Sequence, residues 1–277
     1  MESLSKNILI TGAATGVGLA ISQVLSQSGH NIFATAMPGQ DISELSKITN
    51  VEIIEADLAN DTSINNLIDT VKRKDRVDAI ISNAGIAVPG PIECIAIEEI
   101  KLQYEINVFA PMTLVQGLLP KLRESKGRII FIGAGQGRVC LPFGGPYGSS
   151  KAALSAITDS LRAEIHDSGI RVSVIEPGAI KTGILQSSKD RWASTLASLS
   201  QPLLERYKSS MEKTFKTSEN AFKSAITPLE FAKEISKILS SENPKPRYLI
   251  GKEAKALAFI AILPAKWRAK LILRLVK

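Results

Sequence analysis

The chain has 277 residues, of which 44% are hydrophobic and 22% charged, a composition typical of a soluble globular protein with one large α/β domain or two small ones. Its formal net charge of +7 gathers in residues 252–277, which hold seven basic residues and one acid, so the rest of the chain is nearly neutral. Because no basic stripe with interleaved aromatic residues occurs elsewhere, we expect no nucleic-acid partner.

The two cysteines and the N-terminal residues indicate where in the cell the protein is located. Cys94 and Cys140 have neither CxxC nor other metal-type spacing, so we expect no metal site. A strand-like run begins at Asn7, which leaves no room for a secretory signal peptide. These observations predict a reducing, cytoplasmic location.

Strand and helix patterns alternate along the chain. Short apolar runs predict seven strands, at residues 7–11, 31–35, 51–56, 79–82, 128–132, 171–175 and 247–250. Helical spacing of apolar residues predicts a first helix that ends at Ser28–Gly29 and further helices at residues 64–72, 97–122, 148–166 and 228–240. This alternation predicts a Rossmann-type α/β fold, in which a doubly wound parallel sheet of seven strands carries helices on both faces, in a single domain.

A glycine-rich turn follows the first strand. It reads Thr11-Gly12-Ala13-Ala14-Thr15-Gly16-Val17-Gly18 and leads directly into the first helix. Glycines allow a tight turn and a close approach of the backbone to a pyrophosphate, and the helix N-terminus offers N–H donors. We interpret the turn as part of a dinucleotide-binding unit; the alternative is an ordinary connection between a strand and a helix.

One long stretch breaks the alternation. Between Thr182 and Ile226 the pattern predicts no strand, only amphipathic helical pieces at residues 192–199 and 203–215. Because ligands of doubly wound folds bind at the carboxyl ends of the strands, we expect this segment to be a lid over the substrate. The apolar residues expected in the lid are Ile184, Leu185, Trp192, Leu196, Leu203, Leu204 and Phe215. We predict a catalytic domain at residues 1–251, which includes this lid, and a basic tail at residues 252–277.

Tyr147 and Lys151 are candidates for proton transfer. Four residues apart on a predicted helix, they lie on one face, one turn apart. A lysine beside a tyrosine favours the tyrosinate, which predicts a lowered pKa for Tyr147 and proton exchange near neutral pH. The alternative is a chance pair of exposed polar residues.

Six motifs together carry a family resemblance. They are Thr11-Gly12-x-x-x-Gly16-x-Gly18, Asp57, Asn83-Ala84-Gly85, Asn107, Tyr147-x-x-x-Lys151 and Pro177-Gly178-x-Ile180-x-Thr182. In the order and spacing of these motifs, the chain resembles the short-chain dehydrogenase/reductase family over about residues 5–252. The segment 244–251 and the basic apolar tail resemble the branch that contains 17β-hydroxysteroid and retinol dehydrogenases.

The resemblance implies an NAD(P)-dependent oxidoreductase that interconverts an alcohol and a ketone or aldehyde on a bulky apolar substrate. It implies that Tyr147 exchanges a proton with the substrate oxygen, that Lys151 holds the nicotinamide ribose, and that Asn107 holds a relay water. For Asn107 the alternative is a solvated polar residue on a helix. The residues implied to contact the cofactor are Gly12, Ala14, Thr15, Gly16, Val17, Gly18, Ala36, Met37, Asp57, Leu58, Asn83, Ala84, Gly85, Tyr147, Lys151, Pro177, Gly178, Ile180 and Thr182.

Ala134 departs from the family pattern. The family has a serine at this position, thirteen residues before the tyrosine, and that serine hydrogen-bonds the substrate carbonyl. Loss of one such donor typically lowers the rate by about 10²–10³. Three explanations are open: an engineered, inactivated serine-to-alanine variant; a natural enzyme that uses another donor, such as Gln136 or a water; or an NAD(P)-binding protein without redox turnover, acting as a regulator, scaffold or non-redox catalyst.

The preferred cofactor is predicted from the end of the second strand. Family members that prefer NAD carry an acid there, whereas this chain has Ala36. Met37 and Thr15 stand where NADP-preferring members often carry basic residues. The missing acid removes repulsion against a 2′-phosphate, so we expect NADP(H) to be preferred over NAD(H).

The basic tail has two interpretations. Its apolar run ends at Ala265 and is too short to span a bilayer. Beyond it, Trp267, Leu271 and Leu275 recur at helical spacing, and the basic residues alongside are Lys266, Lys270, Arg274 and Lys277. Such a helix can lie on an anionic membrane surface; the alternative is that it packs on its own domain or on a partner subunit. The resemblance also implies a homodimer or homotetramer built on the helices at residues 97–122 and 148–166.

Overall fold

The computed structural model of the chain describes residues 5–182, 184–223 and 225–275. The side chains of Ile184 and Leu185, which the sequence assigns to the lid, lie outside the described part, as does Lys277 of the tail.

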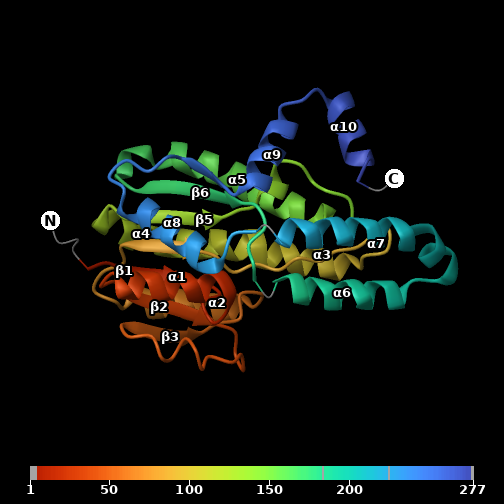
Figure 1. The fold of residues 1–277 in the computed structure, drawn as a ribbon. Coiled ribbons are helices and arrows are strands. Elements are labelled where there is room, and N and C mark those ends of the chain that lie inside the picture. Colours follow the sequence, from red (N-terminus) through yellow and green to blue (C-terminus); the bar gives the residue numbers. More distant parts are fainter. Residues whose placement is uncertain (1–4, 183, 224, 276–277) are drawn as a thin grey trace.

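Seven parallel strands form one sheet in the order β3-β2-β1-β4-β5-β6-β7 (Figure 1). The strands are β1 (Asn7–Ile10), β2 (Asn31–Ala36), β3 (Val51–Glu55), β4 (Ala79–Ser82), β5 (Arg128–Ile132), β6 (Arg171–Pro177) and β7 (Arg247–Ile250). They are rich in isoleucine and valine, which suit a pleated surface that is covered on both sides. The predicted doubly wound fold is confirmed.

Helices cover both faces of this sheet (Figure 1). On one face, α1 (Gly16–Gln27) packs against α8 (Pro228–Ser240). On the other face lie α2 (Asp61–Lys72), α4 (Ala110–Ser125) and α5 (Gly145–Glu164). Each face has its own buried apolar cluster, so the sheet forms the middle layer of three.

The long helix predicted at residues 97–122 is interrupted, and this corrects the prediction. The segment consists of α3 (Ile97–Tyr104), a π-helical turn η1 (Glu105–Phe109) and α4. A π turn inserts an extra residue and so rotates the side chains around it. Asn107, in the middle of η1, has no exposed surface. The wider turn thus directs a polar side chain into the protein.

Two boundaries near the predicted site also differ from expectation. α5 begins at Gly145 and not at Gly148, because Pro146 is compatible with the first turn of a helix, where its missing N–H is not needed. β6 continues to Pro177, which pairs with Ile250 of β7. Tyr147 therefore lies in the first turn of α5.

The predicted lid forms two helices that project from one end of the sheet (Figure 1). They are α6 (Ile184–Ser198) and α7 (Gln201–Lys223), both longer than the helical pieces predicted there. A parallel bridge between Ile180 and Ile226 closes the base of this α6–α7 arm.

The tail also forms two helices, α9 (Lys252–Ala261) and α10 (Ala265–Leu273), with Pro264 as the N-cap of the second. α9 packs on the body, where Ala254 is completely buried. Within the described residues, no helix has both the length and the apolar character needed to cross a bilayer.

Candidate active site

The glycine turn after β1 is packed too closely to accept larger residues. Gly12 and Gly16 adopt φ angles of +64° and +56°, a region that glycine enters without strain. A Cβ atom at Gly18 would lie 2.1 Å from the carbonyl oxygen of Gly12. The turn leads into the N-terminus of α1, whose first residues carry no negative side chain against its partial positive charge. These features fit the pyrophosphate of a dinucleotide.

Asn83 anchors this turn to the end of β4. Its side chain donates to the carbonyl oxygens of Thr11 and Gly12, at 2.9 and 3.1 Å. The Thr11 hydroxyl accepts the N–H groups of Asn83 and Ala84, each at 3.0 Å. β1 and β4 are neighbours across the point where the strand order reverses, which is where doubly wound folds bind ligands.

The segment after β6 reaches the glycine turn. It starts at the sheet, where the N–H of Gly178 donates to the carbonyl of Ile250 at 2.8 Å. It ends at Thr182, whose side-chain carbons lie 3.6 Å from the place that a Cβ of Gly16 would occupy. Residues 177–182 thus lie beside the turn to which the sequence assigns the pyrophosphate.

The ends of β2 and β3 form the side of the site that the sequence assigns to adenosine. Ala36 is buried at the last position of β2, and Met37 after it is 60% exposed. Asp57 follows β3, and its carboxylate accepts the N–H of Ala59 at 2.9 Å. Leu58 beside it is buried. These residues share the carboxyl edge of the sheet with the glycine turn.

Lys151 is buried on α5, with only 4% of its surface exposed. Its ammonium group donates to the carbonyl of Ile132, the last residue of β5, at 2.8 Å. The same Nζ atom lies 6.0 Å from the centre of the Tyr147 ring. A Cβ atom at Gly85 would lie 3.3 Å from this Nζ and 3.1 Å from Oδ1 of Asn107. The structure therefore brings Lys151, Tyr147 and Asn107 together at the ends of β4 and β5.

Asn107 joins the loop after β4 to α5. Its Oδ1 accepts the N–H of Ile86 at 2.9 Å, and its Nδ2 donates to the carbonyl of Ile86 at 2.9 Å and to Oγ of Ser150 at 3.0 Å. Ser150 in turn donates to the carbonyl of Tyr147 at 2.8 Å. Asn107 is thus not the solvated helix residue considered as the alternative; the relay water stays a prediction.

The expected electrostatic effect of Lys151 on Tyr147 is wrong. Tyr147 is half-buried, and burial raises its pKa to about 12, where the sequence predicted a lowered value. Burial also lowers the pKa of Lys151 to about 8. Desolvation disfavours the charged forms of both groups, and a lysine that loses its proton more readily offers less positive charge to a tyrosinate.

Ala134 lies between β5 and η2 (Gly135–Gly137), a short 3-10 turn, and is 5% exposed. The nearby hydroxyls of Ser149 and Ser150 both donate to backbone carbonyls within α5, at 3.0 and 2.8 Å. Both hydroxyl protons are therefore engaged within the helix.

Glycines let η2 approach α5 closely. A Cβ at Gly137 would lie 2.9 Å from the carbonyl carbon of Lys151, and one at Gly148 would lie 3.0 Å from the carbonyl oxygen of Gln136. The side-chain oxygen of Gln136 lies 3.0 Å from the position of a Cβ on Gly144. The carboxamide of Gln136 thus lies beside the loop that leads to Tyr147.

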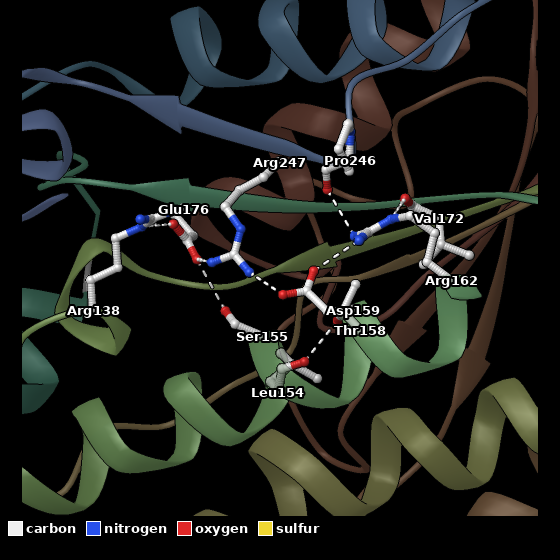
Figure 2. Close-up of polar contacts among 10 residues, drawn as sticks. All are labelled: Arg138, Leu154, Ser155, Thr158, Asp159, Arg162, Val172, Glu176, Pro246 and Arg247. Atoms are coloured by element: carbon white, nitrogen blue, oxygen red, sulfur yellow. Dashed lines mark hydrogen bonds and ion pairs between the residues drawn. The ribbon is translucent and has the colours of Figure 1, made fainter. Parts of the chain in front are cut away.

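A buried carboxylate connects four parts of the site (Figure 2). Glu176 of β6 has no exposed surface and accepts hydrogen bonds from Arg138 after η2, Arg247 of β7 and Ser155 of α5. We call these four residues the Glu176 network. Two charge-assisted bonds and a hydroxyl stabilise a charge that would be very unfavourable alone.

A second carboxylate extends the Glu176 network along α5 (Figure 2). Asp159 accepts from Arg247 at 2.7 Å and from Arg162 at 2.8 Å. Arg162 also donates to the carbonyls of Val172 and Pro246, at 2.9 and 3.0 Å. α5 is thereby fixed to β6 and to the start of β7.

Sequence reasoning missed the Glu176 network and the role of α9. The carboxylate of Glu176, directly after the strand predicted at residues 171–175 of a sheet covered on both faces, was a usable signal because a buried charge needs partners. The position of α9 had no comparable signal. A Cβ at Gly135 would lie 3.0 Å from Cα of Ala254, and one at Gly178 would lie 2.7 Å from Oε2 of Glu253. α9 therefore covers both η2 and the start of residues 177–182.

Aromatic side chains connect the loop before Tyr147 to the α6–α7 arm. The Phe143 ring lies edge-on to Trp192 and Tyr207, with centroids 5.9 and 6.2 Å apart, and Trp192 lies 5.6 Å from Phe215. Phe143 adopts a φ of +60°, which is rare for an aromatic residue and commoner near functional sites.

Comparison with known proteins agrees with the fold. The family described as short chain dehydrogenase matches residues 6–192. The 3-amino-tetrahydro-pyrrolizinone reductase of Xenorhabdus hominickii is 35% identical over 258 residues, 90% of this chain and 88% of that protein. The NADPH-dependent 3-dehydrocapnine reductase of Ornithobacterium rhinotracheale is 35% identical over 191 residues, 65% of this chain and 68% of that protein. The crystal structure of a short chain dehydrogenase from Burkholderia cenocepacia J2315 in complex with NADP has a TM-score of 0.74 at 21% identity, covering 99% of this chain and 98% of that one, and so has the same fold.

The role of the Glu176 network in stability can be tested by substitution of Glu176. Glu176→Gln keeps the shape of the side chain but leaves Arg138 and Arg247 short of a counter-charge, so we expect the free energy of unfolding to fall by about 3 kcal/mol. Urea denaturation measures this. The control is Glu234→Gln, which removes an exposed pair with Lys237 and should change stability by less than about 0.5 kcal/mol. Equal losses of stability in the two variants would contradict the conclusion that the Glu176 network holds a buried charge.

The lowered pKa of Lys151 predicts how the free energy of unfolding changes with pH. Between about pH 8 and its usual pKa of 10.5, a lysine at this position keeps its proton in the unfolded chain and loses it in the folded one. The unfolded state then binds more protons, so stability rises with pH, by at most about 1.4 kcal/mol per pH unit. Unfolding free energies measured from pH 8 to 10 should therefore rise more steeply for the wild type than for Lys151→Met. Parallel pH profiles would refute the lowered pKa of Lys151.

Proposed function

Because this chain belongs to the short-chain dehydrogenase family of NAD(P)-dependent oxidoreductases, we propose that it interconverts a ketone and an alcohol on a bulky apolar substrate. The observation that carries this proposal is the meeting of Tyr147, Lys151 and Asn107 at the carboxyl ends of β4 and β5. They lie on the edge of the sheet that also holds the glycine turn.

The residues around the glycine turn fit a bound dinucleotide. Gly12, Gly16 and Gly18 would hold the pyrophosphate, because the φ angles of Gly12 and Gly16 suit glycine and the backbone of Gly18 approaches that of Gly12 more closely than a side chain would permit. Lys151 would bind the nicotinamide ribose. When bound, the nicotinamide supplies hydride to a carbonyl carbon or takes it back from the alcohol.

Tyr147 acts on the substrate oxygen. In the reducing direction its O–H gives a proton to the carbonyl oxygen, and in the oxidising direction the phenolate takes the proton from the alcohol. A pKa raised to about 12 keeps Tyr147 protonated at neutral pH, which favours its role as the acid in ketone reduction. The buried Lys151 and Asn107 hold the first turn of α5 and so fix the position of the phenol.

Several observations support a bulky apolar substrate. Phe143, Trp192, Tyr207 and Phe215 form an aromatic cluster between the catalytic loop and the α6–α7 arm. The arm is tied to the body by an ion pair between Arg191 and Glu99 at 2.9 Å. Both relatives described above are reductases, one of a pyrrolizinone and one of a dehydrocapnine. A bulky apolar substrate like that of the hydroxysteroid and retinol dehydrogenase branch is consistent with this aromatic cluster.

Gln136 replaces the missing serine in this proposal. Ala134 has no donor, whereas the carboxamide of Gln136 lies beside the loop that leads to Tyr147. An amide N–H can stabilise a developing oxyanion as a hydroxyl does. If the substrate receives no such donor, the chain binds the cofactor and turns over slowly or not at all.

NADPH is the proposed preferred cofactor. Ala36 at the end of β2 presents no carboxylate to repel a 2′-phosphate, and Met37 beyond it is exposed. The dehydrocapnine reductase, 35% identical over 191 residues, is NADPH-dependent by its name.

The assembly and the compartment complete the proposal. Ile97 at the start of α3 and Phe109 just before α4 expose 54% and 52% of their surface, which supports a homodimer or homotetramer through this helical segment. Cys94 and Cys140 are both free thiols, which supports a cytoplasmic location.

Site variants test the proposed reaction. NADPH consumption with a panel of apolar ketones should fall by about 10²–10⁴ in Tyr147→Phe, because the proton donor is lost. Binding of NADPH should persist in this variant, which separates chemistry from cofactor binding. Ala134→Ser should raise the rate by up to about 10²–10³.

One outcome would rule out the redox proposal. Both the wild type and Ala134→Ser would bind NADPH but consume none with any ketone of the panel. That result would favour the alternative of a cofactor-binding protein without redox turnover.

A further inference from the structure

We infer that the outer face of α9 and α10 is a docking surface for an anionic lipid bilayer. The surface consists of Phe259, Ile262, Trp267 and Leu273 together with the basic residues Lys255, Lys266, Lys270 and Arg274. In Figure 1 the two helices project from the body beyond α5 and α7.

The inner face of α9 is already used. Ala254 is completely buried against η2, and Leu257 also lies near this turn, with its Cδ1 3.3 Å from the position of a Cβ on Gly135. Lys255 follows Ala254 by one position and Phe259 follows Leu257 by two, so both lie on the other side of the helix, where they are exposed. α9 therefore has one face fixed to the site and the opposite face directed at solvent.

Exposed apolar side chains are concentrated on this tail. Phe259, Ile262, Trp267 and Leu273 expose 65%, 76%, 63% and 51% of their surface. The other exposed large apolar residues of the described chain are spread along its first 229 positions. Four such residues within a segment of fifteen are a concentration of exposed apolar side chains, and such a concentration, unlike scattered single residues, marks an interaction site.

The charge around these apolar side chains selects the partner. After Glu253 the chain has no acidic residue, while Lys255, Lys266, Lys270 and Arg274 are all exposed. Nζ of Lys270 lies 5.5 Å from the centre of the Trp267 ring. Tryptophan and phenylalanine with neighbouring lysines are typical of helices that lie at the headgroup level of a membrane. Anionic headgroups complement this charge, and acyl chains complement the apolar residues.

A second copy of the chain is a poorer occupant. A symmetric contact would bring the docking surface of one copy against the same surface of the other. The four basic side chains of each copy would then face one another without an intervening acid, and like charges repel.

The helices are held in place relative to the site. Nη1 of Arg268 donates to the carbonyl of Ala261 at 3.2 Å, which joins α10 to the end of α9. The Thr214 hydroxyl of α7 contacts the carbonyl of Leu275 at 3.5 Å, so the tail also reaches the α6–α7 arm. A bilayer bound at this surface would lie next to the arm, but the docking itself does not depend on which substrate the enzyme uses.

Vesicle sedimentation of the full chain tests the inference. The wild type should sediment with phosphatidylcholine vesicles that contain phosphatidylserine and remain in solution with phosphatidylcholine alone. Lys266→Glu with Lys270→Glu should weaken binding by at least about 25-fold, since each basic residue near an anionic surface contributes about fivefold. Phe259→Ser with Trp267→Ser should weaken binding by about tenfold or more.

The matched control lies on α8. Leu229 and Lys233 are exposed there, so Leu229→Ser with Lys233→Glu makes the same kinds of change away from the tail and should leave vesicle binding unchanged. In Trp192→Phe, Trp267 is the remaining tryptophan, and its emission should shift to the blue when vesicles are added.

Three results would overturn the inference. One is the absence of sedimentation with anionic vesicles. Another is binding that falls equally in the α8 control and in the tail variants. The third is a dimer in sedimentation velocity that Phe259→Ser with Trp267→Ser dissociates while vesicles bind neither protein, because the surface would then be a subunit contact.

Discussion

Glu176 lies in β6 with no exposed surface, and Arg138, Arg247 and Ser155 donate to its carboxylate. A buried charge is very unfavourable unless its partners stay within hydrogen-bonding distance. These contacts therefore fix the residues after η2, the start of β7 and the middle of α5 relative to β6. α5 carries Tyr147 in its first turn. The position of Tyr147, the proposed proton donor, therefore depends on a carboxylate that takes no part in the proposed chemistry.

Burial controls the electrostatics of the site in the same way. Lys151 is held by the carbonyl of Ile132, and its pKa falls to about 8 because water is excluded. Tyr147 stays protonated to about pH 12 for the same reason. A negatively charged dinucleotide bound beside Lys151 would favour its charged form again. The protonation of Lys151 is thus linked to cofactor binding, which would raise the pKa of this lysine again.

The sequence was informative where local pattern decides the structure. The glycine spacing from Gly12 to Gly18 and the alternation of strands and helices predicted the doubly wound sheet, because these features depend on backbone geometry and periodicity. It did not predict the π turn at Asn107, since apolar spacing over residues 97–122 is compatible with an uninterrupted helix. The rise in the pKa of Tyr147 could not be predicted from the sequence either, because desolvation depends on all the groups that pack around the phenol. The contact of α9 with Gly135 is tertiary and has no local signal.

Fluorescence titration with NADPH and NADH tests the central claim, that the glycine turn and Lys151 form a dinucleotide site. The account predicts saturable binding of both cofactors, tighter for NADPH, and loss of binding in Gly18→Ala, where the new Cβ would lie 2.1 Å from the carbonyl oxygen of Gly12. Gly29→Ala has open space around it but a φ of +82° that strains alanine, so this control should lose some stability and still bind the cofactors as the wild type does. Absence of saturable binding by the wild type, or equal binding by Gly18→Ala, would contradict the account.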